Sequence, residues 1–264
     1  MGKNICCLFL FLLAFFPATG SVSAASVEFD SRGNLMSSDA GSSEFITRRA
    51  SKFTVPEGVR LQKDIIYEYY PVFGKTFSEI VRSVEENGPL SRTGNTRSKT
   101  KLEWGLGLSY QFDYSYGVDE DENKVHAAVD ILDTDINYRI KITLPTLLDD
   151  TPLNPIEKKL WAAYLQLLLE NEHERAGIIR DINLRNKALE AIKEISYFIF
   201  DYKGDAAVEN TINASLKDDA VKIGRELIKK INERLNDYDR KTEKGGKADM
   251  PERFFTRQPE QSPD

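Results

Sequence analysis

The chain has 264 residues, enough for one or two domains with a sizeable hydrophobic core. With 41% hydrophobic and 30% charged residues, its composition is that of a folded globular protein, not of a collagen-like, globally disordered or polytopic membrane chain. The formal net charge of −6 argues against nucleic acid and anionic membrane surfaces as main partners.

The N-terminus has the pattern of a secretory signal peptide. Lys3 supplies a positive charge, residues 5–16 form an unbroken apolar run, and small residues at 22–24 and 23–25 offer cleavage sites. This run is too short for a helix that spans about 30 Å of hydrocarbon, so we expect cleavage and no stable membrane anchor. We therefore predict a periplasmic or secreted protein.

Both cysteines, Cys6 and Cys7, lie inside this segment. The mature chain would have no cysteine, which excludes disulfides, thiolate metal sites and a cysteine nucleophile. Loss of Lys3 with the signal peptide would leave 35 basic against 42 acidic residues.

Four parts are predicted along the chain. Residues 1–25 are the signal peptide, and residues 26–59, rich in Ser, Gly, Asp and Ala, are a flexible N-terminal arm. Residues 60–245 form the folded domain. Residues 246–264, with three prolines and scattered charges, form a disordered tail.

The first elements of the domain are a short strand and a helix. Residues 64–72 are aromatic and β-branched, which favours a strand. Thr76 and Glu79 form a capping box that starts a helix, and Gly88-Pro89 ends it.

A long antiparallel hairpin is predicted next. Apolar residues occupy every second position from Leu102 to Tyr116, which indicates a strand with one buried face and a bend or bulge at Gly105 or Gly107. After an acidic turn, residues 125–144 alternate again, and the phase changes near residues 132–135, which implies a bulge there. The aromatic residues of the first strand are interpreted as core; exposed, they would indicate a contact surface.

The last part of the domain is predicted to be helical. Asn154, Pro155 and Glu157 start a helix that runs towards Ile179, residues 182–202 continue with helical spacing, and an amphipathic helix covers residues 208–238. Strands followed by helices predict an α+β fold: an antiparallel sheet with a long hairpin, then a helical part.

The first of these helices carries part of a metal motif. A zinc-peptidase helix has the pattern His-Glu-x-x-His, which puts two imidazoles on one helix face and a glutamate beside the metal-bound water. Glu170 and His173 have the matching spacing, but Leu169 stands where the first histidine would be. By spacing alone, the pair is typical of a solvated helix surface.

The order of several short motifs is similar to that of one bacterial family. They are Tyr-Tyr-Pro-Val-Phe-Gly-Lys-Thr at 69–76, Glu-Asn-Gly-Pro at 86–89, Leu-Glu-Trp at 102–104, Ile-Thr-Leu-Pro at 142–145, the helix at 161–173, and Tyr-Asp-Arg-Lys-Thr-Glu-Lys-Gly at 238–245. In these motifs the chain resembles DUF922, a family of secreted zinc-dependent peptidases, from about Tyr67 to Gly245.

The resemblance implies a metal site at Leu169, His173 and Lys244, with Glu170 as general base. Only His173 of the three can bind zinc, because leucine has no donor atom and the lysine ammonium repels the ion. We therefore expect Glu170 and His173 to be vestigial, no cofactor to be required, and zinc only if the family site is retained. Leu169 is expected to be buried in the place of the lost ligand.

Three functions remain open. The first is an exported pseudopeptidase that keeps the fold but not the hydrolysis, with an unknown protein or peptide as its partner. The second is an active metallopeptidase with a rebuilt ligand set, in which His126 or a carboxylate such as Asp239 or Glu209 joins His173 and Glu170. The third is a periplasmic binding or scaffold domain.

Overall fold

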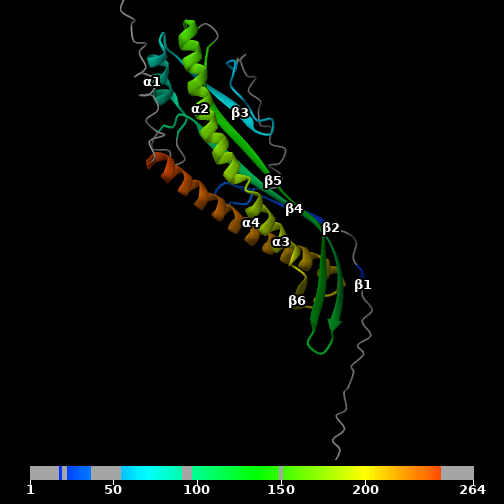
Figure 1. The fold of residues 1–264 in the computed structure, drawn as a ribbon. Coiled ribbons are helices and arrows are strands. Elements are labelled where there is room, and N and C mark those ends of the chain that lie inside the picture. The colour runs from blue at the N-terminus through cyan, green and yellow to red at the C-terminus, as the bar shows by residue number, and fades with distance from the viewer. Residues whose placement is uncertain (1–17, 20–22, 37–54, 91–96, 149–150, 245–264) are drawn as a thin grey trace, which may run out of the picture.

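A computed structural model describes residues 18–19, 23–36, 55–90, 97–148 and 151–244 of the protein. The described residues contain one six-stranded sheet and four helices, and Figure 1 shows the long helices lying along the sheet. The fold is α+β, as predicted. None of the described helices is long and apolar enough to cross a membrane. The predicted tail and most of the predicted signal peptide lie outside the described residues.

The sheet is built on the predicted long hairpin. Strands β4 (Lys101–Asp119) and β5 (Lys124–Leu147) pair antiparallel over the whole of β4 and over residues 124–143 of β5. The register shifts where Gln111 pairs with Asp133 and Phe112 with Ile131, which leaves Leu132 as the extra residue. The bulge predicted from the phase change is confirmed, whereas the one expected at Gly105 or Gly107 is wrong: both glycines stay in the regular ladder.

Shorter strands extend the sheet on both sides of the hairpin. Strand β3 (Ile66–Val72) runs parallel to the C-terminal half of β5, and β6 (Tyr197–Asp201) runs antiparallel to its N-terminal end. Strands β1 (Ala18–Thr19) and β2 (Ser23–Asp30) pair antiparallel with β4. The strand predicted at 64–72 is confirmed. Because β3 is parallel to its neighbour, the sheet is mixed and not wholly antiparallel.

Strand β2 corrects the prediction of a flexible arm at 26–59. The first residues of that segment pair with β4, and the side chains of Val27 and Phe29 are 4% and 0% exposed. Phe29 packs against Gly224 so closely that a Cβ atom there would lie 2.5 Å from its ring. The prediction of a flexible arm is therefore wrong for residues 26–36, because this short strand pairs with β4 and buries Val27 and Phe29 in the core. Residues 37–54 lie outside the described part.

The helices begin where the capping residues predict. Helix α1 (Phe77–Asn87) is capped by Thr76, and α2 (Pro155–Ile179) by a complete capping box of Asn154 and Glu157. Helix α3 (Ile182–Lys193) is followed by β6 and then by α4 (Asp205–Lys244). The helix predicted over 182–202 is thus wrong after residue 193, because the aromatic and β-branched residues of β6 complete the sheet beside β5.

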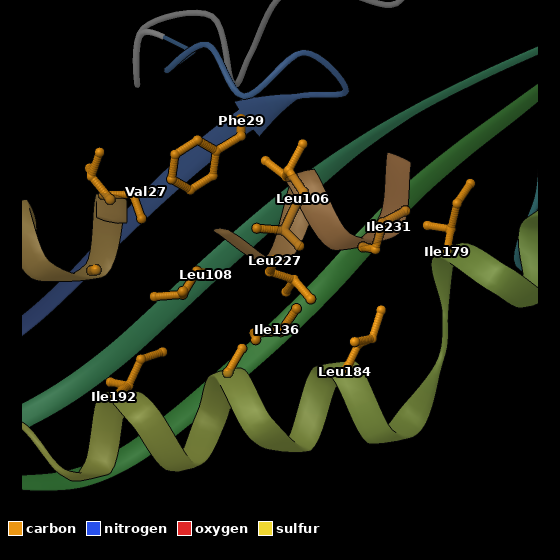
Figure 2. Packing of buried hydrophobic residues seen from close by; sticks show 14 of the residues in the cluster. Val27, Phe29, Leu106, Leu108, Ile136, Ile179, Leu184, Ile192, Leu227 and Ile231 are labelled. Atoms are coloured by element: carbon orange, nitrogen blue, oxygen red, sulfur yellow. The ribbon is translucent and has the colours of Figure 1, made fainter. Parts of the chain in front are cut away.

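The main core lies between the sheet and helices α2, α3 and α4. Figure 2 shows side chains from β2, β4, β5 and the helices meeting there, among them Phe29, Leu106, Ile136, Ile192 and Leu227. Tyr110 and Phe112 are buried in this cluster, and Tyr114 and Tyr116 pack against it. The aromatic face of β4 is therefore core, as interpreted, and not an exposed stripe.

Candidate functional site

Helix α2 places its three motif positions in three different environments. Leu169 is 0% exposed and belongs to the main core, which confirms its predicted burial. Glu170 faces solvent, where its Oε1 accepts a 2.9 Å hydrogen bond from the Nε2 of Gln166. His173 is half-buried on the side that faces β3. The helix is thus the predicted one: Leu169 and His173, four residues apart, share its inner side, whereas Glu170 points to solvent.

His173 is hydrogen-bonded to a tyrosine. Its Nε2 atom lies 2.7 Å from the hydroxyl oxygen of Tyr67 on β3, and that oxygen accepts the backbone N–H of Gln62 at 3.0 Å. Burial, and then the positive charge of Arg180, lower the pKa of His173, so the neutral imidazole is favoured. A neutral ring that accepts the tyrosine proton at Nε2 carries its own hydrogen at Nδ1.

His173 is one of three side chains, two on α2 and one on its C-cap residue Arg180, that hold the segment before β3 and the start of that strand. Gln166, His173 and Arg180 are spaced by seven residues, which is close to two helical turns, and we call them the anchoring row. The Oε1 of Gln166 accepts the backbone N–H of Arg60 at 3.0 Å, and Arg180 makes a 2.8 Å ion pair with Asp64. The row therefore fixes the segment at 60–64 and the start of β3 against the helix.

Next to His173 in the chain begins an acidic network, which consists of Glu172 and Arg175 of α2 and Asp239 of α4. Glu172 is only 3% exposed and accepts a short hydrogen bond from the hydroxyl of Thr100. Arg175 lies 3.4 Å from Glu172 and 3.4 Å from Asp239 of α4, so it links the two carboxylates. Burial raises the pKa of Glu172. Sequence reasoning missed Glu172, although its position three residues after Leu169 and three before Arg175 is the signal that could have found it.

The C-terminal part of α4 lies against this region of α2. Arg234 is ion-paired with Asp181, and the hydroxyl of Tyr238 donates a 2.6 Å hydrogen bond to Glu174. These contacts show that the two helices run in opposite directions, so the last turns of α4 extend towards the level of Glu170. Lys244 is the last residue of the helix, and its side chain lies outside the described part.

His126 lies at the opposite end of the hairpin. It pairs with Ile199 of β6, and its Nδ1 atom is 2.5 Å from the hydroxyl of Tyr197. Tyr67, the partner of His173, pairs with Ile142 on the same strand β5. Sixteen residues of strand separate the two positions, or roughly 50 Å along the chain. The two histidines therefore cannot share a metal ion.

The carboxylates considered as replacement ligands are engaged elsewhere. Asp239 faces Arg175, and Glu209 accepts a 3.3 Å hydrogen bond from Ser23. The described residues include no group of three or more His, Cys, Asp or Glu side chains placed to hold a metal. With a leucine in the core and the Nε2 of His173 only 2.7 Å from the hydroxyl oxygen of Tyr67, the described residues do not fit a catalytic zinc ion, which needs three protein ligands.

The fold and the site define an α+β protein whose helix α2 carries Glu170 and His173 at the spacing of a zinc-peptidase motif, with Leu169 in the core. The model of a bacterial protein family of unknown function, DUF922, matches residues 67–246, which is more than half of the chain. The protein belongs to this family, which confirms the resemblance. No curated protein matches the chain, and no solved structure does. The matched region begins at Tyr67 and contains the anchoring row, the acidic network and the end of α4.

Proposed function

We propose that this DUF922 protein is an exported pseudopeptidase, which keeps the motif helix of a zinc peptidase but uses its residues for structure. The hydrogen bond between His173 and Tyr67 carries the proposal. It occupies the one imidazole nitrogen that faces β3, and it does so within a row of three side chains whose common partner is a protein segment. The imidazole of His173 thereby connects helix α2 to strand β3 of the sheet.

The burial of Leu169 supports the same proposal. A histidine at this position would have to be desolvated in the main core or would have to swing out of it, and a buried polar group without a partner is costly. Leucine removes that cost and adds apolar contacts, worth about 2 kcal/mol for a fully buried side chain. A leucine in place of a histidine at position 169 therefore both removes a metal ligand and improves the packing of the core.

The exposed side chain of Glu170 fits no remaining catalytic role. A general base in metal-assisted hydrolysis acts on water that the metal has polarised. In this chain the carboxylate of Glu170 is solvated and bonded to Gln166, four residues earlier on the same helix. The pair stabilises the helix surface, as side chains at this spacing commonly do.

Export is part of the proposal and is supported by the N-terminal pattern described above. Cleavage after Ala24 or Ala25 would remove β1 and the first residues of β2 but keep Val27 and Phe29. The mature chain would thus retain both core anchors. N-terminal sequencing of the protein recovered from the bacterial periplasm tests this point: we expect Ala25 or Ser26 as first residue, and an intact Met1 would refute export with cleavage.

Metal analysis tests the loss of the zinc site. The purified wild-type protein should contain no stoichiometric zinc after dialysis, and a Leu169→His, Lys244→His double variant should gain it. The two single variants are the controls, because each restores one of the two missing donors. Tightly bound zinc in the wild-type protein, with proteolysis that a chelator stops, would overturn the proposal.

A further inference from the structure

A polar cavity lies between the turn that follows β2 and the C-terminal half of helix α4. Its volume is about 570 Å³, and it is lined by turn residues, among them Arg32 and Asn34, and by α4 residues between Arg225 and Asn236. This volume is within the range of small-molecule sites, about 300 to 1,000 Å³. The turn precedes the region that matches DUF922, so the family does not account for the cavity.

The turn is fixed by its own hydrogen bonds and by helix α4. One carboxylate oxygen of Asp30 accepts the backbone N–H groups of Arg32 and Asn34 at 2.8 and 3.0 Å. The other oxygen accepts the side-chain amide of Asn34 at 2.9 Å. From α4, the amide of Asn232 donates a 2.9 Å hydrogen bond to the carbonyl oxygen of Ser31. The fold therefore sets the position of Arg32 at the cavity.

The guanidinium group of Arg225 is held on one side. Its Nε atom donates a 3.4 Å hydrogen bond to the carbonyl oxygen of Gly33 in the turn. In the part of the chain that the structure describes, no acceptor is bonded to its two Nη atoms. A guanidinium held at Nε keeps further N–H groups for a second partner, and their fork geometry matches the oxygens of a carboxylate or a phosphate.

The lining of the cavity is positive although the chain is acidic. Arg32, Arg225 and Lys229 line it together with one carboxylate, that of Glu233, so its lining has a net charge of +2, whereas the whole chain has −6. None of the three cations forms an ion pair with another described residue. Arg225 and Lys229 are four residues apart on α4, where like charges destabilise a helix. A bound anion would offset this repulsion.

We propose that this cavity binds a small soluble phosphate monoester that carries hydroxyl groups, a function that goes beyond the proposed loss of peptidase activity. A phosphate monoester has a charge of about −1.5 to −2 at pH 7, which matches the net charge of the lining. Its three terminal oxygens accept charge-assisted hydrogen bonds from guanidinium and ammonium groups. A carboxylate or a phosphodiester has a single negative charge and would leave part of the positive charge unmatched.

The rest of the cavity suits hydroxyl groups. Glu233 and the carboxamides of Asn34 and Asn236 belong to the lining. A carboxylate accepts hydrogen bonds, and a carboxamide both donates and accepts them, so these side chains can bind the hydroxyl groups of a ligand. A large apolar ligand is disfavoured, because Ile228 is the one large apolar residue in the described lining. A phosphorylated polyol therefore satisfies both the charged and the neutral polar groups.

Isothermal titration calorimetry of the purified protein with glycerol phosphate tests the proposal. We expect saturable binding of glycerol phosphate and no binding of glycerol at the same concentrations. Dimethyl phosphate, which has a single charge, should bind about tenfold more weakly or less tightly still. The absence of saturable binding of glycerol phosphate, or equal binding of glycerol or of dimethyl phosphate, would overturn the proposal.

A variant of Lys229 links this binding to the cavity. Lys229→Met should weaken the binding of glycerol phosphate by about tenfold or more, because it removes a charged donor to the phosphate. Its side chain is exposed and forms no ion pair with a described residue, so the variant should fold as the wild type does, which circular dichroism checks. Lys222→Met is the matched control, since Lys222 is on the same helix but pairs with Asp219 and does not line the cavity. Equal weakening by both variants would show an effect of net charge alone and would refute the site.

Vesicles distinguish a soluble ligand from a lipid headgroup. Phosphatidic acid presents the same monoester group at a membrane surface. We expect no co-sedimentation of the protein with phosphatidylcholine vesicles that contain phosphatidic acid, because the negative charge of the whole chain opposes an anionic surface. Co-sedimentation that Lys229→Met abolishes and Lys222→Met does not would overturn the assignment to a soluble ligand.

Discussion

The Nε2 atom of His173 lies 2.7 Å from the hydroxyl oxygen of Tyr67, and this hydrogen bond joins helix α2 to strand β3. Both residues fall within the region that matches DUF922. The bond gives the one histidine that the metal motif retains a partner on strand β3. Its consequences for stability and for pH dependence can be measured directly.

Tyr67→Phe should lower the free energy of unfolding by about 1 kcal/mol or somewhat more, because it removes the bond to His173 and leaves the N–H of Gln62 without its acceptor. Urea denaturation measures the effect. Tyr138→Phe is the control, since the Tyr138 hydroxyl is buried and no residue in the described part of the chain forms a hydrogen bond with it, so its removal should be neutral or stabilising. Equal losses for the two variants would contradict the role of Tyr67.

His173→Gln should change the pH dependence of stability. Because the pKa of His173 in the folded protein lies below its usual value of 6.5, the unfolded chain binds the proton more readily. The wild-type protein should therefore lose stability relative to the variant as the pH falls below 6.5, until the folded protein is also protonated. Denaturation curves at several pH values measure this difference; a difference that is constant with pH would show that His173 is not perturbed.

Leu169→Ala should cost about 2 to 5 kcal/mol of unfolding free energy, because the side chain is completely buried and its removal leaves a cavity. Leu167→Ala is the control on the same helix and should cost less, since Leu167 is only partly buried. If both variants lose the same small amount, the motif position is not a core position.

Glu172→Gln should stabilise the protein at neutral pH but not in acid. Burial raises the pKa of Glu172 above the usual value of 4.5, so ionisation penalises the folded state once the pH exceeds 4.5. The amide imitates the protonated carboxyl and avoids this penalty. The advantage of the variant should grow from pH 4.5 upwards and level off above the folded pKa. A variant less stable at pH 7 than at pH 4.5, relative to wild type, would show that pairing with Arg175 outweighs burial.

Phe29→Ala should cost about 3 to 5 kcal/mol, because its ring is buried between β4 and Gly224 of α4. Leu35→Ala provides the comparison within the same segment, since Leu35 is 45% exposed and its loss should change stability by less than about 1 kcal/mol. A neutral Phe29→Ala variant would mean that β2 does not contribute to the fold.

Much of the fold could be predicted because its signals are local. The alternation along residues 102–116 predicted β4, and the phase change near Leu132 predicted the bulge in β5. Thr76 and the pair Asn154 and Glu157 marked two helix starts correctly. Such patterns depend only on neighbouring residues, so they can be recognised without knowledge of contacts between distant segments.

The errors arose where distant segments decide the structure. Strand β6 has apolar residues that also suit a helix, and only the free edge of β5 made the strand form. The short strand β2 was predicted to be a polar arm, because its partner strand β4 and the residue that Phe29 packs against, Gly224 of α4, lie far away in the sequence. Propensity is a weak guide where tertiary pairing supplies most of the free energy.

The sequence by itself determined the α+β class, the family and the identity of the motif positions, because residue types and their spacing define a helix face and its possible donor atoms. Only the tertiary structure decided what these residues do. In the folded protein Leu169 lies in the core and His173 is hydrogen-bonded to Tyr67. His126 lies at the other end of β5 from the residue that pairs with Tyr67. Hydrogen bonds and burial depend on which surfaces come into contact. These contacts join residues that lie more than 100 positions apart in the sequence, such as Tyr67 and His173.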